Sequence, residues 1–192
     1  MLGKFLKKNR GFTLVELLVT IAIIGVLAGL STYSLVSTRA KAKEAVALND
    51  IAQIKKSIEM LGNDTGLWPG HQTLNIVCTD LMGGCPEGNE ICGVDENGSD
   101  CSYGLRDGFS GIVENDTLNS FPAWNGPYMN KIPLDPWGHE YFFDTDYEVT
   151  VDNEPCDGGT SCLNAVVVGS YGPNGEGNNS YDEDDIITIM LR

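Results

Sequence analysis

The first third of the chain carries one long hydrophobic pattern that changes character halfway along. Residues 17–36 form twenty consecutive positions without a charged side chain, enough for a helix rising about 1.5 Å per residue to cross roughly 30 Å of hydrocarbon. Basic residues precede this run, and the positive-inside rule places that end in the cytoplasm; they are Lys4, Lys7, Lys8 and Arg10. The pattern predicts a single membrane-spanning helix, with the rest of the chain outside the cytoplasm.

Beyond Val36 the apolar residues recur at helical spacing, while charged residues occupy the other faces. This stripe consists of Ala47, Leu48, Ile51, Ile54, Ile58 and Leu61, and its spacing is typical of an amphipathic helix. No proline interrupts residues 12–61. We therefore expect one continuous helix, apolar all round in its first half and striped in its second, which ends at Gly62, Asn63 and Asp64.

The last third of the chain carries strand patterns rich in aromatic and β-branched residues. They cover residues 140–144, 147–151, 163–168 and 186–191. Turn residues separate them, which favours antiparallel pairing because parallel strands need long crossover connections. The expected fold class is α+β: a long N-terminal helix, with its apolar half projecting, packed on a small antiparallel sheet that carries a Gly/Asp-rich C-terminal loop.

Six cysteines lie beyond the apolar run, among Gly, Asp, Asn and Pro. An even number in such a setting favours disulfides in an extracytoplasmic head, with zinc binding and free thiols as alternatives. No Cys-x-x-Cys pair is present to support zinc. The first choice of pairing is Cys156 with Cys162, the closest neighbours, and weaker choices are Cys78 with Cys85 and Cys92 with Cys101.

Charge is distributed unevenly and limits the partners. The net charge is −15, and residues 62–192 carry 23 acidic against 3 basic residues. Such a surface repels phosphate groups, so we expect no nucleic acid to bind the head. Divalent cations are the natural counter-ions.

One carboxylate, Glu16, interrupts the start of the apolar helix. A charge at membrane depth costs several kcal/mol unless it is paired or reaches the interface. Glu16 therefore either has a partner of opposite charge or reaches the inner headgroups.

Residues 11–16, followed by the uncharged helix, resemble the N-terminus of the type IV pilin superfamily. Its precursors have a short basic leader ending in Gly, cleaved before a Phe that becomes N-methylated, with Glu at the fifth mature position. The resemblance implies a cleaved leader (1–11), a helix half for the membrane and the filament core (12–36) and a head (37–192). It also implies a prepilin peptidase that methylates Phe12. Cleavage between Gly11 and Phe12 would create an α-amino group at Phe12 that can pair with Glu16. Tyr33 stands where the family has proline.

A second motif, residues 126–141, is similar to that of the major pseudopilins of type II secretion. Pro133, Pro136 and Gly138 favour a tight turn, and Trp137 and Tyr141 supply apolar area to fix it on the core. The resemblance implies a homo-oligomeric pseudopilus filament that drives export of folded proteins, with minor pseudopilins and an inner-membrane assembly platform as partners. It leaves residues 70–123 as a cysteine-rich insertion.

The resemblance also implies where the protein acts: in the bacterial inner membrane as a single-pass precursor, and in the periplasm or at the cell surface as a filament. The alternative is a type IV pilus subunit for adhesion, motility or DNA uptake. A membrane-anchored calcium-binding surface protein is a further possibility. We do not expect an enzyme, because neither His71 nor His139 belongs to a recognisable catalytic pattern.

Residues 169–186 combine glycines with hard oxygen ligands. Calcium takes six to eight oxygens and suits such flexible loops, whereas adjacent acids without a cation repel one another. The pseudopilin resemblance implies one structural calcium, with side chains of Asn174, Asp182 and Asp185 and carbonyls of Tyr171 and Ser180 as ligands. Asn174 replaces an Asp of the family and the spacing differs, so Asp184 stays an alternative to Asp185. The alternative hypothesis is that these residues form a solvated acidic loop without bound calcium.

Overall fold

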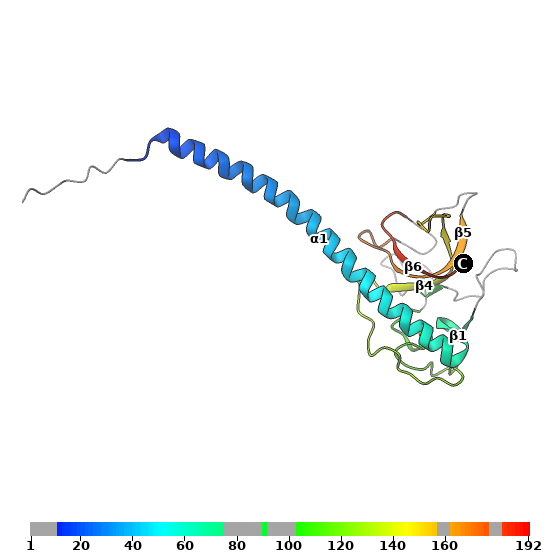
Figure 1. Cartoon of the computed structure of the whole chain (residues 1–192). Coiled ribbons are helices and arrows are strands. Elements are labelled where there is room, and N and C mark those ends of the chain that lie inside the picture. The colour runs from blue at the N-terminus through cyan, green and yellow to red at the C-terminus, as the bar shows by residue number, and fades with distance from the viewer. Residues whose placement is uncertain (1–10, 75–89, 92–102, 157–161, 177–181) are drawn as a thin grey trace, which may run out of the picture. The chain divides into compact units, whose positions relative to one another are not determined.

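The computed structural model describes residues 11–74, 90–91, 103–156, 162–176 and 182–192, without the side chains of residues 30–36 and Glu90. The chain divides into two compact units, residues 1–42 and residues 43–192. Helix α1, Leu14–Thr65, contributes to both units (Figure 1). The four cysteines at 78, 85, 92 and 101 lie outside the described residues, so their pairing stays a prediction.

The first unit consists of the apolar beginning of α1. Every large apolar side chain from Phe12 to Leu27 is exposed, with exposed fractions of 47–82%. Among the described residues, no helix is long and apolar enough to cross a membrane. The predicted membrane-spanning segment, residues 17–36, includes residues 30–36, whose side chains the structure does not describe.

The second unit contains a four-stranded antiparallel sheet. Its strands are β3 (Glu90–Ile91), β4 (Tyr141–Val149), β5 (Leu163–Ser170) and β6 (Ile186–Leu191), in the order β3-β4-β5-β6. Phe143 pairs with Val168, and Val168 in turn pairs with Thr188. Two very short strands, β1 (Leu67–Trp68) and β2 (Gln72–Thr73), form a separate pair around the 3-10 turn η1 (Pro69–His71). A further 3-10 turn is η3 (Gly108–Ser110). The expected α+β class with an antiparallel sheet is confirmed.

Both faces of the sheet are buried along most of β4 and β5. Successive side chains of a strand point to opposite faces, so each face has its own apolar group. One face presents Tyr141, Phe143, Val166 and Val168 to the core that includes α1. The other face has its own apolar group, composed of Phe142, Tyr147, Val149, Ala165, Val167 and Tyr171. Double burial explains why β5 has three consecutive valines instead of an alternating pattern.

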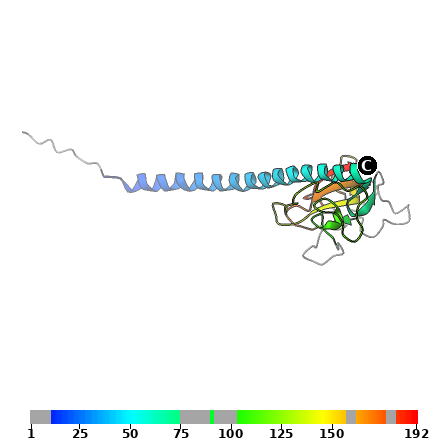
Figure 2. The same ribbon diagram turned by 90° about the horizontal axis from the view of Figure 1, so that it is seen from below.

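The second half of α1 packs on the first of these faces (Figure 2). Ile51, Ile54, Ile58 and Leu61 are completely buried, and each stabilises the fold by roughly 1.5–3 kcal/mol. Leu48, which the sequence assigned to the same stripe, is exposed. The prediction was wrong there because Leu48 follows the buried Ala47 directly, which places it about 100° further round the helix.

Polar contacts fix how α1 lies on the sheet. The Tyr141 hydroxyl donates to Asp50 Oδ2 over 3.0 Å, and Lys55 Nζ donates to the Ile189 carbonyl, also over 3.0 Å. Burial, and then the adjacent Asp50 carboxylate, raises the pKa of Tyr141. The phenol therefore stays protonated and acts as the donor.

The helix ends at Thr65, just past the end predicted at Gly62, Asn63 and Asp64. Gly62 stays helical, and a Cβ there would lie 3.1 Å from Leu74 Cδ2, so the missing side chain makes room for packing. The helix is closed by Gly66 at φ 75°, whose N–H donates to the Gly62 carbonyl over 2.9 Å. A left-handed glycine just past the last turn is a common helix terminator.

The segments 140–144 and 147–151, predicted as two strands, form the single strand β4. Its register shifts between Asp144 and Tyr147, and Asp144 Oδ1 accepts a hydrogen bond of 2.8 Å from the Asp146 N–H. This is a bulge, which bends a strand without reversing it. The segment Asp144-Thr145-Asp146 has no glycine or proline to form a hairpin turn.

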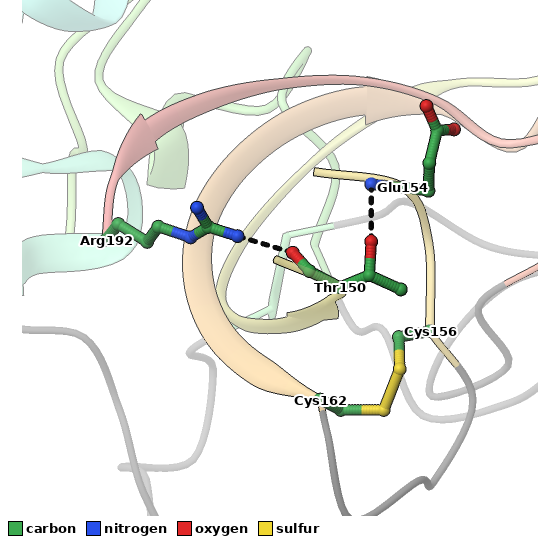
Figure 3. The surroundings of a disulfide bond; sticks show 5 residues. All are labelled: Thr150, Glu154, Cys156, Cys162 and Arg192. Atoms are coloured by element: carbon green, nitrogen blue, oxygen red, sulfur yellow. Dashed lines mark hydrogen bonds between the residues drawn. A yellow bond between two sulfur atoms is a disulfide. The ribbon is translucent and has the colours of Figure 1, made fainter. Parts of the chain in front are cut away.

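The connection between β4 and β5 carries a disulfide between Cys156 and Cys162, with Cα atoms 5.8 Å apart (Figure 3). This agrees with the first pairing chosen from the sequence. Thr150 and Glu154 exchange hydrogen bonds across the same connection, and the Arg192 guanidinium donates to the carbonyl of Thr150. The disulfide and Arg192 together fix this end of the sheet.

Replacing both Cys156 and Cys162 by serine should lower the free energy of unfolding of the full chain by about 2 kcal/mol. The bond closes a loop of sequence separation 6, and opening a loop this short restores a modest amount of chain entropy to the unfolded state. Urea titration without reductant measures the change. Val151→Ser, an exposed change in the same connection, is the control; an unchanged double variant would contradict the stabilising role.

Candidate functional site

The N-terminus of α1 is closed by a reciprocal pair of contacts between Thr13 and Glu16. Glu16 Oε2 accepts hydrogen bonds from the Thr13 N–H over 2.8 Å and from the Thr13 hydroxyl over 2.7 Å. The Glu16 N–H donates in return to Thr13 Oγ1 over 3.3 Å. This is a capping box, in which a Thr and a Glu three residues later satisfy free donors of the first helical turn. Before any cleavage, the Glu16 carboxylate therefore already has a local partner.

The residues expected at the cleavage point lie before this cap. Gly11 and Phe12 are both exposed and precede the first helical residue, Leu14. An exposed segment outside helices and strands is the kind of segment that a peptidase can bind. The geometry is thus compatible with cleavage between Gly11 and Phe12.

The acidic loop brings together three of the expected calcium ligands. The Asn174 amide nitrogen, Nδ2, donates to Asp182 Oδ2 over 2.7 Å and to Asp184 Oδ1 over 2.8 Å. The backbone N–H of Asn174 donates to Asp184 Oδ2 over 3.1 Å. Asp184 therefore takes part in the loop as fully as Asp182. Ser180 lies outside the described residues.

Asp185 points toward the core instead of toward Asn174. Its Oδ2 accepts hydrogen bonds from the Tyr147 hydroxyl over 2.5 Å and from the Asp182 N–H over 3.4 Å. Its Oδ1 is buried and has no hydrogen-bond partner among the described residues. The Tyr171 side chain stacks on Phe142, with ring centroids 4.3 Å apart, while its carbonyl accepts from the Gly175 N–H.

These residues fit a cation only in part. The unpartnered Asp185 Oδ1 is the kind of buried oxygen that a cation would satisfy. All four carboxylate oxygens of Asp182 and Asp184, however, already accept a hydrogen bond. Among the described residues, no group of three or more His, Cys, Asp or Glu side chains is arranged to hold a metal ion. Calcium therefore stays a proposal.

The three carboxylates have different proton affinities. Burial raises the pKa of Asp185 to about 7, the Tyr147 hydroxyl opposes this, and Asp182 adds to it by charge repulsion. Burial likewise raises the pKa of Asp184, and its contact with Asp182 raises it further. For Asp182, burial acts to raise the pKa, but its hydrogen bonds with Asp184 and Asn174 outweigh burial, so the pKa of Asp182 is lowered.

Gly172 allows the two arms of the loop to meet. Its φ is 61°, and a Cβ there would lie 2.0 Å from the Asp184 carbonyl oxygen. A side chain at this position would therefore push the Asp184 backbone away from Asn174. Since glycine adopts positive φ without steric cost, position 172 needs a glycine on both counts.

The turn motif is organised around one buried carboxylate, Asp135. Its Oδ1 accepts from the N–H groups of Trp137, Gly138 and His139 over 2.8–2.9 Å. Its Oδ2 accepts from the Ser170 hydroxyl over 2.6 Å. One carboxylate thus fastens the turn to the end of β5, next to the acidic loop.

The two histidines and Trp137 also make specific contacts. The His71 ring stacks on the Phe121 ring with centroids 3.8 Å apart, and His71 Nε2 lies 3.2 Å from Asp116 Oδ2. His139 Nδ1 lies 3.1 Å from the Gly172 carbonyl, so it donates to the acidic loop. Lys43 Nζ lies 5.6 Å from the centroid of the Trp137 ring. Trp137 thus contacts a cation of the helix, but among the described residues it belongs to neither of the two apolar clusters of the sheet.

Sequence reasoning missed two contributors to these sites. Thr13 could have been found, because Thr13-x-x-Glu16 is the recognised pattern of a capping box. Tyr147 could not, since its contact with Asp185 joins positions 38 residues apart. No local pattern marks a contact across that distance.

The chain is similar to known proteins along most of its length. It matches the model of the prokaryotic N-terminal methylation motif over residues 6–32 and that of type II secretion system protein G over residues 103–188. Type II secretion system core protein G of Escherichia coli K12 is 30% identical over 136 residues, which are 70% of each chain. The protein of the same name from Pseudomonas aeruginosa is 28% identical over 137 residues, which cover 70% of this chain and 72% of that one.

A crystal structure of the major pseudopilin from the type 2 secretion system of enterohaemorrhagic Escherichia coli is also similar. The matched region covers 80% of this chain and 87% of that pseudopilin chain, with 17% sequence identity and a TM-score of 0.45.

A methylation motif at the start of a long helix that packs on an antiparallel sheet defines a protein of the type IV pilin class. Within that class, the chain belongs to the family of type II secretion system core protein G. The family match begins at Tyr103, so it takes in residues 103–123, which the sequence analysis had assigned to the insertion.

Without a bound cation, Asp185 should make stability depend on pH. Its folded-state pKa of about 7 lies above the ordinary 3.8, so the folded chain binds this proton more tightly. The contribution to stability is complete below about pH 4 and is lost as the pH rises through about 7. In chelator, the wild type should lose on the order of a few kcal/mol relative to Asp185→Asn over this range.

Denaturant titrations of both proteins at several pH values test this expectation. Asp152→Asn, at an exposed position, is the matched control and should follow the wild type. Parallel pH profiles of the wild type and Asp185→Asn would contradict the burial-driven shift.

Proposed function

We propose that this chain is a structural subunit of the pseudopilus filament of a type II secretion system. Membership of the protein G family supports this function. So does the exposed apolar surface of Phe12 and of α1 up to Leu27, because contiguous exposed apolar surface of this kind marks an interaction site. Repeated copies that bury this surface against one another through non-closing contacts form a filament. The relatives named above are secretion proteins, which favours this role over a type IV pilus subunit.

The precursor matures by cleavage after Gly11 and N-methylation of Phe12. The methylation motif over residues 6–32 supports this step, and a prepilin peptidase that also methylates is the partner it needs. Cleavage removes the four basic residues of the leader and leaves a positive amino group four residues before Glu16.

Glu16 then pairs with the methylated amino group of Phe12 in a neighbouring subunit. The exchange replaces the neutral contacts with Thr13 by an ion pair in surroundings from which water is excluded. A charge pair is much stronger there than in water. Because one pair forms for each subunit, it also sets the axial register of the filament.

The precursor lies in the inner membrane, with its acidic head outside the cytoplasm and the basic leader inside. Minor pseudopilins and an inner-membrane assembly platform are the further partners, and the filament extends through the periplasm. The subunit acts mechanically, by pushing folded proteins toward the outer membrane, and not as an enzyme.

The acidic loop binds one structural calcium ion. Asp182, Asp184 and Asp185 supply carboxylate oxygens, Asn174 supplies its amide oxygen, and Tyr171 and Ser180 supply carbonyls. The buried, unpartnered Asp185 Oδ1 supports a cation at this place. Bound calcium would remove the repulsion among adjacent acids and so stabilise the head.

Glu16→Ala should leave leader cleavage largely intact and abolish roughly 90% or more of filament assembly. Without Glu16, the charged Phe12 amine of the neighbouring subunit stays unpaired in apolar surroundings, which costs on the order of several kcal/mol. Electron microscopy of filaments released from the cells measures assembly, and the intact mass of subunit extracted from the membrane fraction measures cleavage and methylation.

Glu44→Ala is the matched control, because Glu44 is an exposed acid on the same helix and its loss should leave assembly unchanged. Wild-type protein that begins at Met1 would sink the maturation model. Normal filaments from Glu16→Ala would refute the role given to Glu16.

Calcium should raise the melting temperature of the full chain, with a midpoint on the order of 10⁻⁴–10⁻³ M, the range of extracellular calcium sites. Thermal unfolding in increasing CaCl₂ against EDTA measures it. Asp185→Asn should weaken the response, whereas the exposed Asp152→Asn should not. A wild type that melts at the same temperature at every calcium concentration would exclude the ion.

A further inference from the structure

The amide of Asn174 lies between two carboxylates of the acidic loop. Its Nδ2 donates one hydrogen bond to Asp182 Oδ2 at 2.7 Å and a second to Asp184 Oδ1 at 2.8 Å. Each amide hydrogen thus points to a different carboxylate. A neutral donor of two hydrogens takes the place between negative groups where a cation would otherwise neutralise them.

The orientation of this amide is fixed by its surroundings. Asn174 Oδ1 accepts from the Glu176 N–H over 2.8 Å. An N–H can only donate and an ionised carboxylate can only accept, so a reversed amide would face mismatched partners on both sides. The hydrogen-bond pattern therefore selects the orientation with nitrogen toward the acids.

An amide in this orientation cannot bind a metal. Calcium needs an oxygen ligand, and Asn174 presents its N–H groups to the interior of the loop. To offer Oδ1 to an ion, the side chain must turn over. It would then lose its hydrogen bonds to Asp182, Asp184 and Glu176 together.

A second observation concerns Asp185, a buried carboxylate that adjoins the loop. Asp185 is 7% exposed, and its Oδ1 is buried without a hydrogen-bond partner among the described residues. Its carboxylate adjoins the loop, because Oδ2 accepts from the Asp182 N–H. The loop thus combines one satisfied part, around Asn174, with one buried oxygen that has no hydrogen-bond partner among the described residues.

We propose that the Asn174 amide is a built-in substitute for the cation. It closes the loop without calcium, and calcium binds only when the Asn174 side chain turns its oxygen inward. Asn174 is then the residue that sets calcium affinity in this chain. The proposal extends the calcium part of the proposed function and is independent of the filament assignment.

The test uses Asn174→Asp in the full chain. Aspartate cannot donate, so this variant should melt on the order of 5 °C below the wild type in EDTA. It supplies one more ligand charge and has no hydrogen bonds to break, so its calcium affinity should exceed that of the wild type at least about tenfold. Thermal unfolding and calorimetric titration with CaCl₂ measure the two effects.

Two further variants make the result specific. Asn130→Asp adds the same charge at an exposed position of the head and should change neither quantity. Asn174→Leu removes both donor and ligand, so it should lose stability in EDTA without recovering it in calcium. If Asn174→Asp does not fold, Asn174→Leu with wild-type stability in EDTA overturns the proposal.

The proposal is also overturned if Asn174→Asp matches the wild type in EDTA or binds calcium no more tightly. If Asn174→Asp binds calcium and the wild type does not, the substitute role of Asn174 is supported, and the calcium part of the proposed function fails for the natural chain. Filament formation by the wild type in EDTA is measured in a separate experiment. A failure of the proposed assembly is therefore distinguishable from a failure of the calcium-binding or stability predictions.

Discussion

The contact between the apolar stripe of α1 and the sheet is the interaction on which the head depends. Ile51, Ile54, Ile58 and Leu61 cover the face formed by β4 and β5. Without the helix this face would be exposed to water, and a small sheet rarely folds alone. One helix thus serves two environments: its second half is core, while its first half offers an exposed apolar surface to other molecules.

The opposite face of the sheet supports the acidic loop. Phe142, Tyr147 and Tyr171 stack there, and Tyr147 carries the hydroxyl that reaches Asp185. Asp135 fixes the neighbouring turn to Ser170 at the end of β5, and His139 joins that turn to Gly172. The turn motif and the acidic loop are therefore one connected structure, and a change in either is felt by the other.

Carboxylates recur in this protein as acceptors for local donors. Glu16 accepts from Thr13, Asp135 from three backbone N–H groups, and Asp182 and Asp184 from Asn174. Of these acids only Asp135 is buried, and it needs its donors because an unsatisfied buried acid destabilises the fold. At Glu16 and in the acidic loop, the local donors would also compete with the partners proposed above: the amine of a neighbouring subunit in one case, a cation in the other.

The sequence by itself determined the long helix, the antiparallel sheet, the family and the pairing of Cys156 with Cys162. Each rests on local signals, namely apolar periodicity, β-branched runs, a contiguous motif and short spacing. Only the tertiary structure decided that the helix continues past Gly62, that residues 141–149 form one bulged strand, and that Tyr147 reaches Asp185. These outcomes depend on which surfaces meet: Leu74 packs where Gly62 lacks a side chain, and β5 pairs along both parts of β4. The direction of the Asn174 amide belongs to the same class, because it follows from contacts with groups up to ten residues away.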